Sequence, residues 1–171
     1  RDDEGRVMSK MTKNGSCFDQ MIFPWEQGYP DDFDQINSAF KSINWIMHSH
    51  TKYIDIDQNE LRNRTSKLRE STDKAIVMSG GAKLLELGFF LRRMDNLLMD
   101  LLADSTNLSK LLDKLMDLHL TAIEKKLNAV GDLVDVIRFG DDLGMTTGPF
   151  MDLDTFRIHF KPRYKILCDY V

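Results

Sequence analysis

Two adjacent acids, Asp141 and Asp142, directly follow the apolar stretch LVDVIRFG at residues 133–140. Removing a carboxylate from water is costly, so an acidic pair at the end of a buried strand needs a physical reason. Adjacent like charges and partial burial raise the pKa of one acid, which suits it to proton transfer. We expect at least one of the pair to face a substrate cleft, as an orienting group or proton acceptor. The structural alternative is a turn in which one Asp caps backbone N–H groups.

The loop that follows the acids holds further candidates for ligand binding. Gly144, Thr146 and Thr147 lie in a run of turn-forming residues that ends at Gly148. Backbone N–H groups in such a run can cradle a phosphate or a carboxylate, although a plain turn is the favoured interpretation.

The histidines give no metal signal. His48 and His50 are two positions apart, a spacing that does not place them on one helical face, so no metal site is predicted there. His119 falls on the apolar stripe of an expected long helix, where a core histidine is the more common finding than a ligand.

The strongest strand predictions are residues 74–81 and 131–140. Each is an apolar run without regular polar alternation, which is typical of strands buried on both faces in parallel sheets. Weaker strands are expected at 6–11 and 52–57.

Apolar residues at helical spacing predict the remaining elements. The expected helices are 30–47, 59–71 with Leu61 and Leu68 turned inward, 84–104 with a break at Gly88, Ser105 or Asn107 to about Ala129, and a last helix capped by Asp152 and interrupted at Pro162.

Strands and helices therefore alternate, and no hairpin dipeptide joins the two strong strands. This order predicts right-handed βαβ units and a parallel sheet, an α/β fold. Ligands in such folds bind at the carboxyl ends of the strands. Those ends are residues 79–81 and 140–142, so the acidic pair lies where catalytic and ligand-binding residues of such folds are usually found.

Length and composition bound the class of protein. The 171 residues, 42% of them hydrophobic, are enough for a single domain over 1–171 with one core. A net charge of −4 with scattered Lys and Arg argues against nucleic acid as the main partner. Cys17 and Cys168 are far apart and are expected to be reduced thiols in a cytoplasmic protein. No apolar run approaches the roughly 20 residues that span a membrane, and a first residue other than Met suggests a fragment.

The stretch 131–167, GDLVDVIRFGDDLGMTTGPFMDLDTFRIHFKPRYKIL, resembles the uroporphyrinogen decarboxylase superfamily. Members carry a strand ending in F-x-D-D-L-G, a turn, a helix, and then KPRYK. The upstream segment 88–102 is similar to the family's G-F-x-L-R segment, and residues 2–5, DDEG, are similar to its DEWG opening. The resemblance implies a (β/α)₈ TIM barrel, of which this chain would form the N-terminal to central part.

The resemblance also implies two chemistries. One is cofactor-free decarboxylation of uroporphyrinogen in porphyrin biosynthesis. The other is methyl transfer with a methyl-corrinoid protein as partner, in some members assisted by zinc bound through a His-x-Cys pair and a later Cys. The double Asp looks more like the methyltransferases, because decarboxylases tend to carry Ser where this chain has Asp141.

Other positions favour the same side of the family. Phe89 stands where the family's site tyrosine is expected, and the decarboxylase segment RQAGRY is missing. Arg92 matches the family's Arg after G-F-x-L, where it could bind a substrate carboxylate, with an ion pair to Asp95 as the alternative. Any zinc ligands would lie outside this chain, so no cofactor is expected to bind within it.

The expected function is therefore a fragment of a methyltransferase that acts on a small molecule together with a corrinoid protein. The alternatives are a uroporphyrinogen decarboxylase and an inactive barrel fragment. A complete barrel takes about 250 residues and eight strands. Two strong strands cannot close one, so a homo-oligomer, most simply a dimer that covers the open side, is expected, and the chain alone is expected to lack catalysis.

Overall fold

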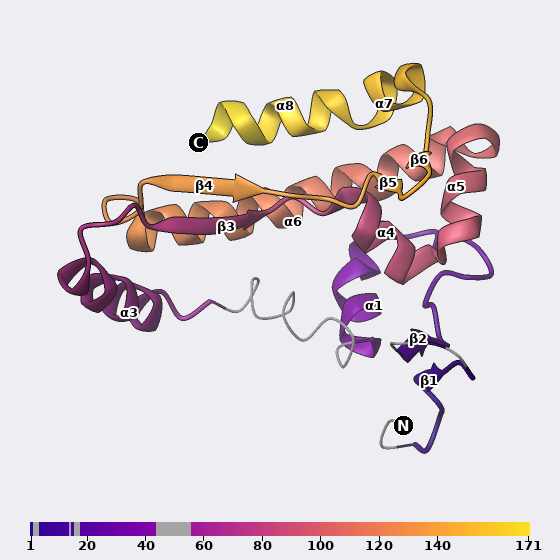
Figure 1. Cartoon of the computed structure of the whole chain (residues 1–171). Helices are drawn as coiled ribbons and strands as arrows, with labels where there is room; N and C mark the ends of the chain where they lie inside the picture. The colour runs from indigo at the N-terminus through magenta and orange to yellow at the C-terminus, as the bar shows by residue number, and fades with distance from the viewer. Residues whose placement is uncertain (2–3, 14, 16–17, 44–55) are drawn as a thin grey trace.

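The computed structural model describes residues 1, 4–13, 15, 18–43 and 56–171 (Figure 1). These residues form a mixture of helices and short strands, and the strands make three two-stranded sheets. Cys17, His48, His50 and most of the strand expected at 52–57 lie outside the described residues.

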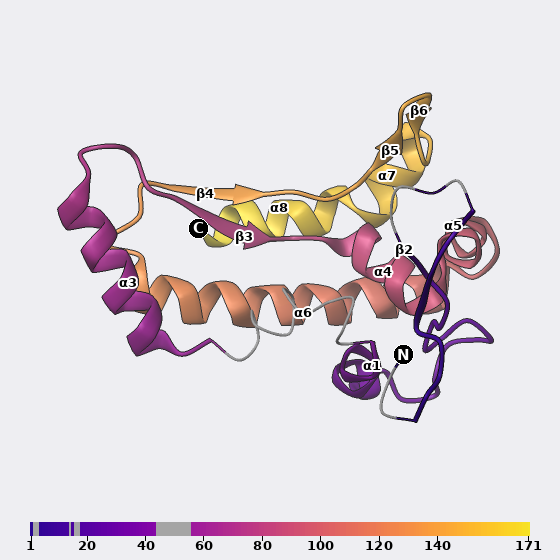
Figure 2. The ribbon, with the colours of Figure 1, turned by 60° about the horizontal axis from the view of Figure 1, so that its bottom comes forward.

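The long helix α6 (Ser105–Val130) is the element on which the others pack (Figure 2). Asp104 caps it, since its carboxylate accepts a hydrogen bond from the Asn107 backbone N–H at 3.2 Å. Its apolar stripe is buried, as the spacing predicts, and includes Leu108, Leu111, Leu112, Leu115 and Ile123. The predicted start and end of this helix are confirmed to within a residue.

Strands β3 (Val77–Gly81) and β4 (Val136–Phe139) pair in parallel, with Val77 opposite Val136. The pairing joins the two segments that the sequence predicts as the strongest strands, and three helices, including α6, separate them in the chain. The barrel is not shown: the described residues give this sheet two strands only. The other pairs, β1 (Ser9–Met11) with β2 (Phe18–Gln20) and β5 (Gly144–Met145) with β6 (Gly148–Pro149), are antiparallel.

One face of the β3–β4 pair is open. Helices α6 and α8 (Lys161–Tyr170) lie on the same side of the two strands, both below β4 in Figure 2. On the other side Val77 is 58% and Val136 47% exposed. The expectation that both strands are buried on both faces is therefore wrong, because the described residues place nothing on this face.

Helices α4 (Leu84–Arg92) and α5 (Met94–Ala103) are the two pieces expected at 84–104, but they meet at Arg93 rather than at Gly88. Arg93 has a positive φ of 68°, which ends α4. Gly88 lies inside α4 for a different reason: a Cβ there would come within 2.6 Å of the Leu97 side chain. The glycine allows α4 and α5 to approach closely.

The N-terminal region adds an aromatic corner to the core. A 3₁₀ turn, η1 (Phe33–Gln35), leads into α1 (Ile36–Ser42), which is shorter than the helix expected at 30–47 over the part that is described. Trp25, Tyr29 and Phe33 contact one another, with ring centroids 5.7–6.3 Å apart.

Helix α3 (Gln58–Ser71) docks mainly through polar contacts. Arg62 forms a bidentate pair with Asp132, and Arg69 binds Asp135 and the Leu133 carbonyl. Leu68 is 49% exposed, so its expected inward orientation is wrong.

The C-terminal helices follow the prediction. Asp152 caps α7 (Leu153–His159) by accepting hydrogen bonds from the backbone N–H groups of Asp154 and Thr155. Pro162 lies in the first turn of α8, where its missing N–H costs nothing.

Candidate functional site

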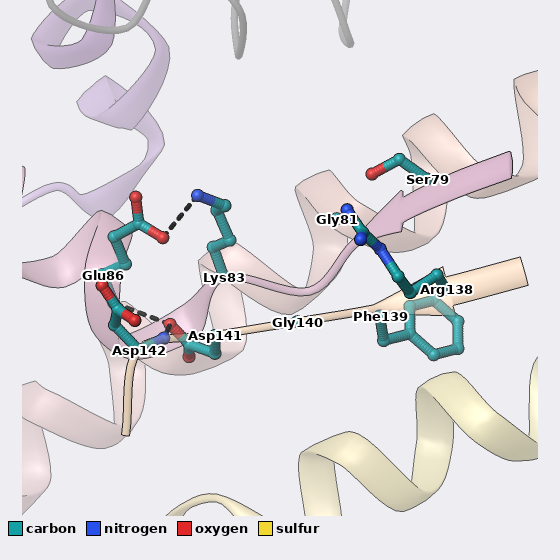
Figure 3. Close-up of a pocket in the computed structure, with 9 residues that line it drawn as sticks. All are labelled: Ser79, Gly81, Lys83, Glu86, Arg138, Phe139, Gly140, Asp141 and Asp142. Atoms are coloured by element: carbon teal, nitrogen blue, oxygen red, sulfur yellow. Dashed lines mark hydrogen bonds and ion pairs between the residues drawn. The ribbon is translucent and has the colours of Figure 1, made fainter. Parts of the chain in front are cut away.

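A cleft of about 410 Å³ opens at the carboxyl ends of β3 and β4 (Figure 3). Both candidate acids line it. The full lining is Ser79, Gly81, Lys83, Glu86, Arg138, Phe139, Gly140, Asp141 and Asp142.

Glycines allow the chain to pack closely where β3 ends beside the cleft. A Cβ at Gly80 would come within 2.4 Å of the Phe139 ring, so no larger residue fits where the two strands meet. Gly81 has a φ of 78°, and its carbonyl accepts a hydrogen bond from Gly140 N–H at 3.0 Å. Ala82 also has a positive φ, 72°, and this left-handed pair turns the chain from β3 into α4.

Asp141 caps α4 from outside the helix. One carboxylate oxygen accepts hydrogen bonds from the backbone N–H of Glu86 (3.0 Å) and of Asp142 (2.9 Å). The other accepts from Leu85 N–H (2.7 Å) and from the Tyr164 hydroxyl (2.6 Å). Lys83, the residue before α4, provides no side-chain cap, so Asp141 supplies the acceptors that the helix lacks locally.

Burial raises the pKa of Asp141 above its ordinary value, although its hydrogen bonds act in the opposite direction. Burial, with the negative charge of Asp141 beside it, also raises the pKa of the Tyr164 hydroxyl. The two groups form one hydrogen-bonded unit that joins the end of β4 to α4 and α8. Asp141 thus has the turn and capping role that was the structural alternative, at the strand end where a ligand-facing acid was expected.

Asp142 differs from its neighbour. It is exposed and lines the cleft, and its carboxylate forms no hydrogen bond or ion pair with any other residue that the structure describes. Its own backbone N–H is held by Asp141, which fixes the backbone from which the side chain projects. Of the acidic pair, Asp142 is the one available to a ligand.

Three more charged side chains complete the cleft. Lys83 and Glu86 form an ion pair at 2.5 Å, drawn as a dashed line in Figure 3. Arg138 is exposed on the open face of β4 and has no hydrogen bond or ion pair within the described part of the chain. Strand alternation in VIRF, with Ile137 and Phe139 on the covered face, was the signal in the sequence that could have identified Arg138.

Arg92 does not reach the cleft. Its guanidinium forms a bidentate contact with Asp100 (2.8 and 3.3 Å) and donates to the carbonyls of Trp25 and Glu26. Asp100 is buried and Arg92 is half-buried, and the guanidinium lies 5.0 Å from the centre of the Tyr29 ring. The structure gives Arg92 a role in holding the N-terminal region against α4 and α5, and its partner is not Asp95.

The remaining candidates are also outside the cleft lining. Phe89 packs edge-to-face on Phe150, with ring centroids 5.5 Å apart. Gly144 lies in β5, and Thr146 and Thr147 form the exposed turn between β5 and β6. The two threonines therefore form a plain turn, which was the favoured alternative to an anion-binding loop.

Among the described residues, no three His, Cys, Asp or Glu side chains gather closely enough to hold a metal ion. None of the described helices is long and apolar enough to cross a membrane. Comparison of the chain with protein-family models, with curated proteins and with solved structures found no match.

Proposed function

We propose that the cleft at the carboxyl ends of β3 and β4 is part of the ligand site of an α/β enzyme. The observation that carries this proposal is the position of Asp142 and Arg138, two charged side chains without partners among the described residues, at the edge of two parallel strands. Parallel sheets bind their ligands at this edge because the loops that follow the strands converge there.

We further propose that β3 and β4 are neighbouring strands of a uroporphyrinogen decarboxylase-like (β/α)₈ barrel. Support comes from the arrangement of layers, since α6 and α8 cover one face and the opposite face exposes Val77 and Val136. In a barrel that opposite face points inward and is packed by side chains from the other strands.

Within that family, we propose methyl transfer with a methyl-corrinoid partner protein rather than decarboxylation. The support is the resemblance at Asp141 and Phe89 described above. The partner's corrinoid would carry the methyl group, while this chain would bind and orient the small-molecule substrate, with Asp142 accepting a hydrogen bond from it. The described residues do not fit a zinc site, so no step is assigned to zinc.

The test compares two reactions of the protein that contains this chain. One sample is incubated with methylcobalamin and candidate methyl acceptors, and the cobalt spectrum is followed. The other receives uroporphyrinogen, and its products are separated by the number of carboxyl groups. We expect acceptor-dependent demethylation that slows in Asp142→Asn. Stepwise loss of carboxyl groups would instead establish the decarboxylase, and inactivity in both assays would favour the inactive fragment.

For the 171 residues on their own, we also propose that a second copy of the chain covers Val77 and Val136 on the open face, at the ends of β3 and β4 that lie away from the cleft. An uncovered parallel pair leaves unpaired backbone groups on both outer edges and two exposed valines. Light scattering after size exclusion should give a dimer. Val77→Lys should shift it to a monomer, whereas Leu102→Lys, on the outer side of α5 and already 82% exposed, should not. A wild-type monomer at high concentration would contradict this proposal.

A further inference from the structure

Some charged side chains of the cleft already have partners within the protein, and others do not. Lys83 and Glu86 neutralise each other in the ion pair at 2.5 Å. Each oxygen of Asp141 accepts two hydrogen bonds. Arg138 and Asp142 remain, one cation and one anion, without partners among the described residues.

These two side chains lie on different sides of the same cleft. In Figure 3 Arg138 lies at the end of the cleft beside the strands, and Asp142 lies past Gly140 near the start of α4. They are four residues apart on extended backbone, which separates their Cα atoms by at most about 13 Å. A Cβ at Gly140 would meet no atom within 4 Å, so the space between them is open.

We propose that this cleft binds a small zwitterion, with its carboxylate on Arg138 and its ammonium group facing Asp142. The guanidinium fork matches a carboxylate in geometry and forms two charge-assisted hydrogen bonds with it. The inference rests on the proposed ligand site and specifies the class of its ligand.

The sign of the surrounding charge favours a carboxylate over a phosphate. Glu86, Asp141 and Asp142 all line the cleft, against the two cations Lys83 and Arg138. A phosphate dianion would meet this excess of negative charge, whereas a molecule with one negative and one positive group complements it.

The test is a titration of the ¹⁵N-labelled protein followed through the amide signals of Gly81, Gly140 and Asp142. The probes are glycine, 4-aminobutanoate and 6-aminohexanoate, each beside analogues of the same length that lack the amine or the carboxylate, and inorganic phosphate. We expect at least one zwitterion to bind more tightly than both of its analogues and than phosphate. Arg138→Gln should weaken that zwitterion and its carboxylate analogue about tenfold.

Two further variants test the carboxylate and the ammonium group of the ligand separately. Arg138→Lys keeps the charge but loses the fork, and should lie between wild type and Arg138→Gln. Asp142→Asn should weaken the zwitterion and its amine analogue and leave the carboxylate analogue unchanged. Arg138 and Asp142 are both exposed, and an unchanged spectrum away from the cleft verifies the fold.

The outcomes distinguish this inference from the proposal beneath it. If the cleft amides respond to probes but Arg138→Gln binds them as wild type does, or if phosphate binds best, the zwitterion inference is overturned and the ligand site stands. If no probe moves any cleft amide, both the inference and the ligand site as formed by this chain are overturned.

Discussion

Replacing Asp141 and Asp142 one at a time by Asn separates a residue that holds the fold from one that faces the cleft. An Asn at 141 keeps one acceptor oxygen and puts an NH₂ group in place of the other. Each oxygen of Asp141 serves two donors, so two donors lose their acceptor whichever way the amide is turned.

The cost follows from those lost contacts. A hydrogen bond to a charged group contributes about 1.5–3 kcal/mol, and relief from burying the charge offsets part of the loss. We expect Asp141→Asn to lower the free energy of unfolding by about 2–4 kcal/mol, which lowers Tm by about 5–15 °C for a chain of this size. Asp142→Asn, at an exposed carboxylate, should change stability by less than about 0.5 kcal/mol.

Urea unfolding followed by circular dichroism measures both variants, and Tyr164→Phe serves as a partial control because it removes one of the four donors. A stability of Asp141→Asn equal to that of wild type would refute the capping role. If Asp142→Asn were the more destabilising of the two, the assignment of roles within the pair would be reversed.

The raised pKa of Asp141 adds a dependence on pH. A carboxyl group whose pKa is higher in the folded than in the unfolded chain stabilises the fold while it is protonated. That contribution is complete below the unfolded value of 3.8 and is lost as the pH rises through the folded pKa. The stability deficit of Asp141→Asn should therefore be larger below pH 3.8 than at pH 7. Carbon-detected NMR should show Asp141 titrating above, and Asp152 below, the ordinary value.

Three further predictions concern the packing that positions the cleft. Gly88→Ala should destabilise the protein by about 1–3 kcal/mol in urea unfolding, because its Cβ would clash with Leu97; an unchanged midpoint would mean that α4 and α5 separate easily. Asp100→Ala should cost about 2–4 kcal/mol, since it leaves the half-buried guanidinium of Arg92 without its carboxylate partner, and the double change with Arg92→Met should cost less than the single one. Burial lowers the pKa of Lys126 to about 8, so between about pH 8 and 9.5 the Lys126 amine is mostly neutral in the folded chain and protonated in the unfolded chain. The free energy of unfolding should therefore rise by about 1.5 kcal/mol over this range. A rise that persists in Lys126→Met would exclude Lys126 as its source.

Much of the local structure was predictable because it depends on neighbouring residues. The cap at Asp152, the extent of α6 and the parallel pairing of the two apolar strands follow from spacing and residue type. The open face of β3 and β4 was not predictable, because an apolar run shows that a strand needs cover but not whether the described chain provides it.

The fate of Arg92 shows a second limit of sequence reasoning. Helical spacing directs attention to Asp95, three residues on, but the helix ends at Arg92 itself, and Asp95 pairs with Arg93 instead. The actual partner, Asp100, comes from the next helix, which folds back across the break. Periodicity within one helix cannot predict a contact that depends on where that helix stops.

The adjacent acids illustrate how one short motif can carry both a structural and a functional role. Consecutive residues on extended backbone point in opposite directions, so only one of two neighbouring acids can face inward. Asp141 points to the first turn of α4, where backbone N–H groups and the end of the helix dipole favour a negative charge, and this offsets part of the cost of its burial. The backbone that Asp141 fixes then presents Asp142 to the cleft. No single substitution can therefore exchange the roles of the two acids. Loss of Asp141 should weaken ligand binding indirectly, because it changes the position of Asp142, although the Asp141 carboxylate itself has no hydrogen-bonding capacity left for a ligand.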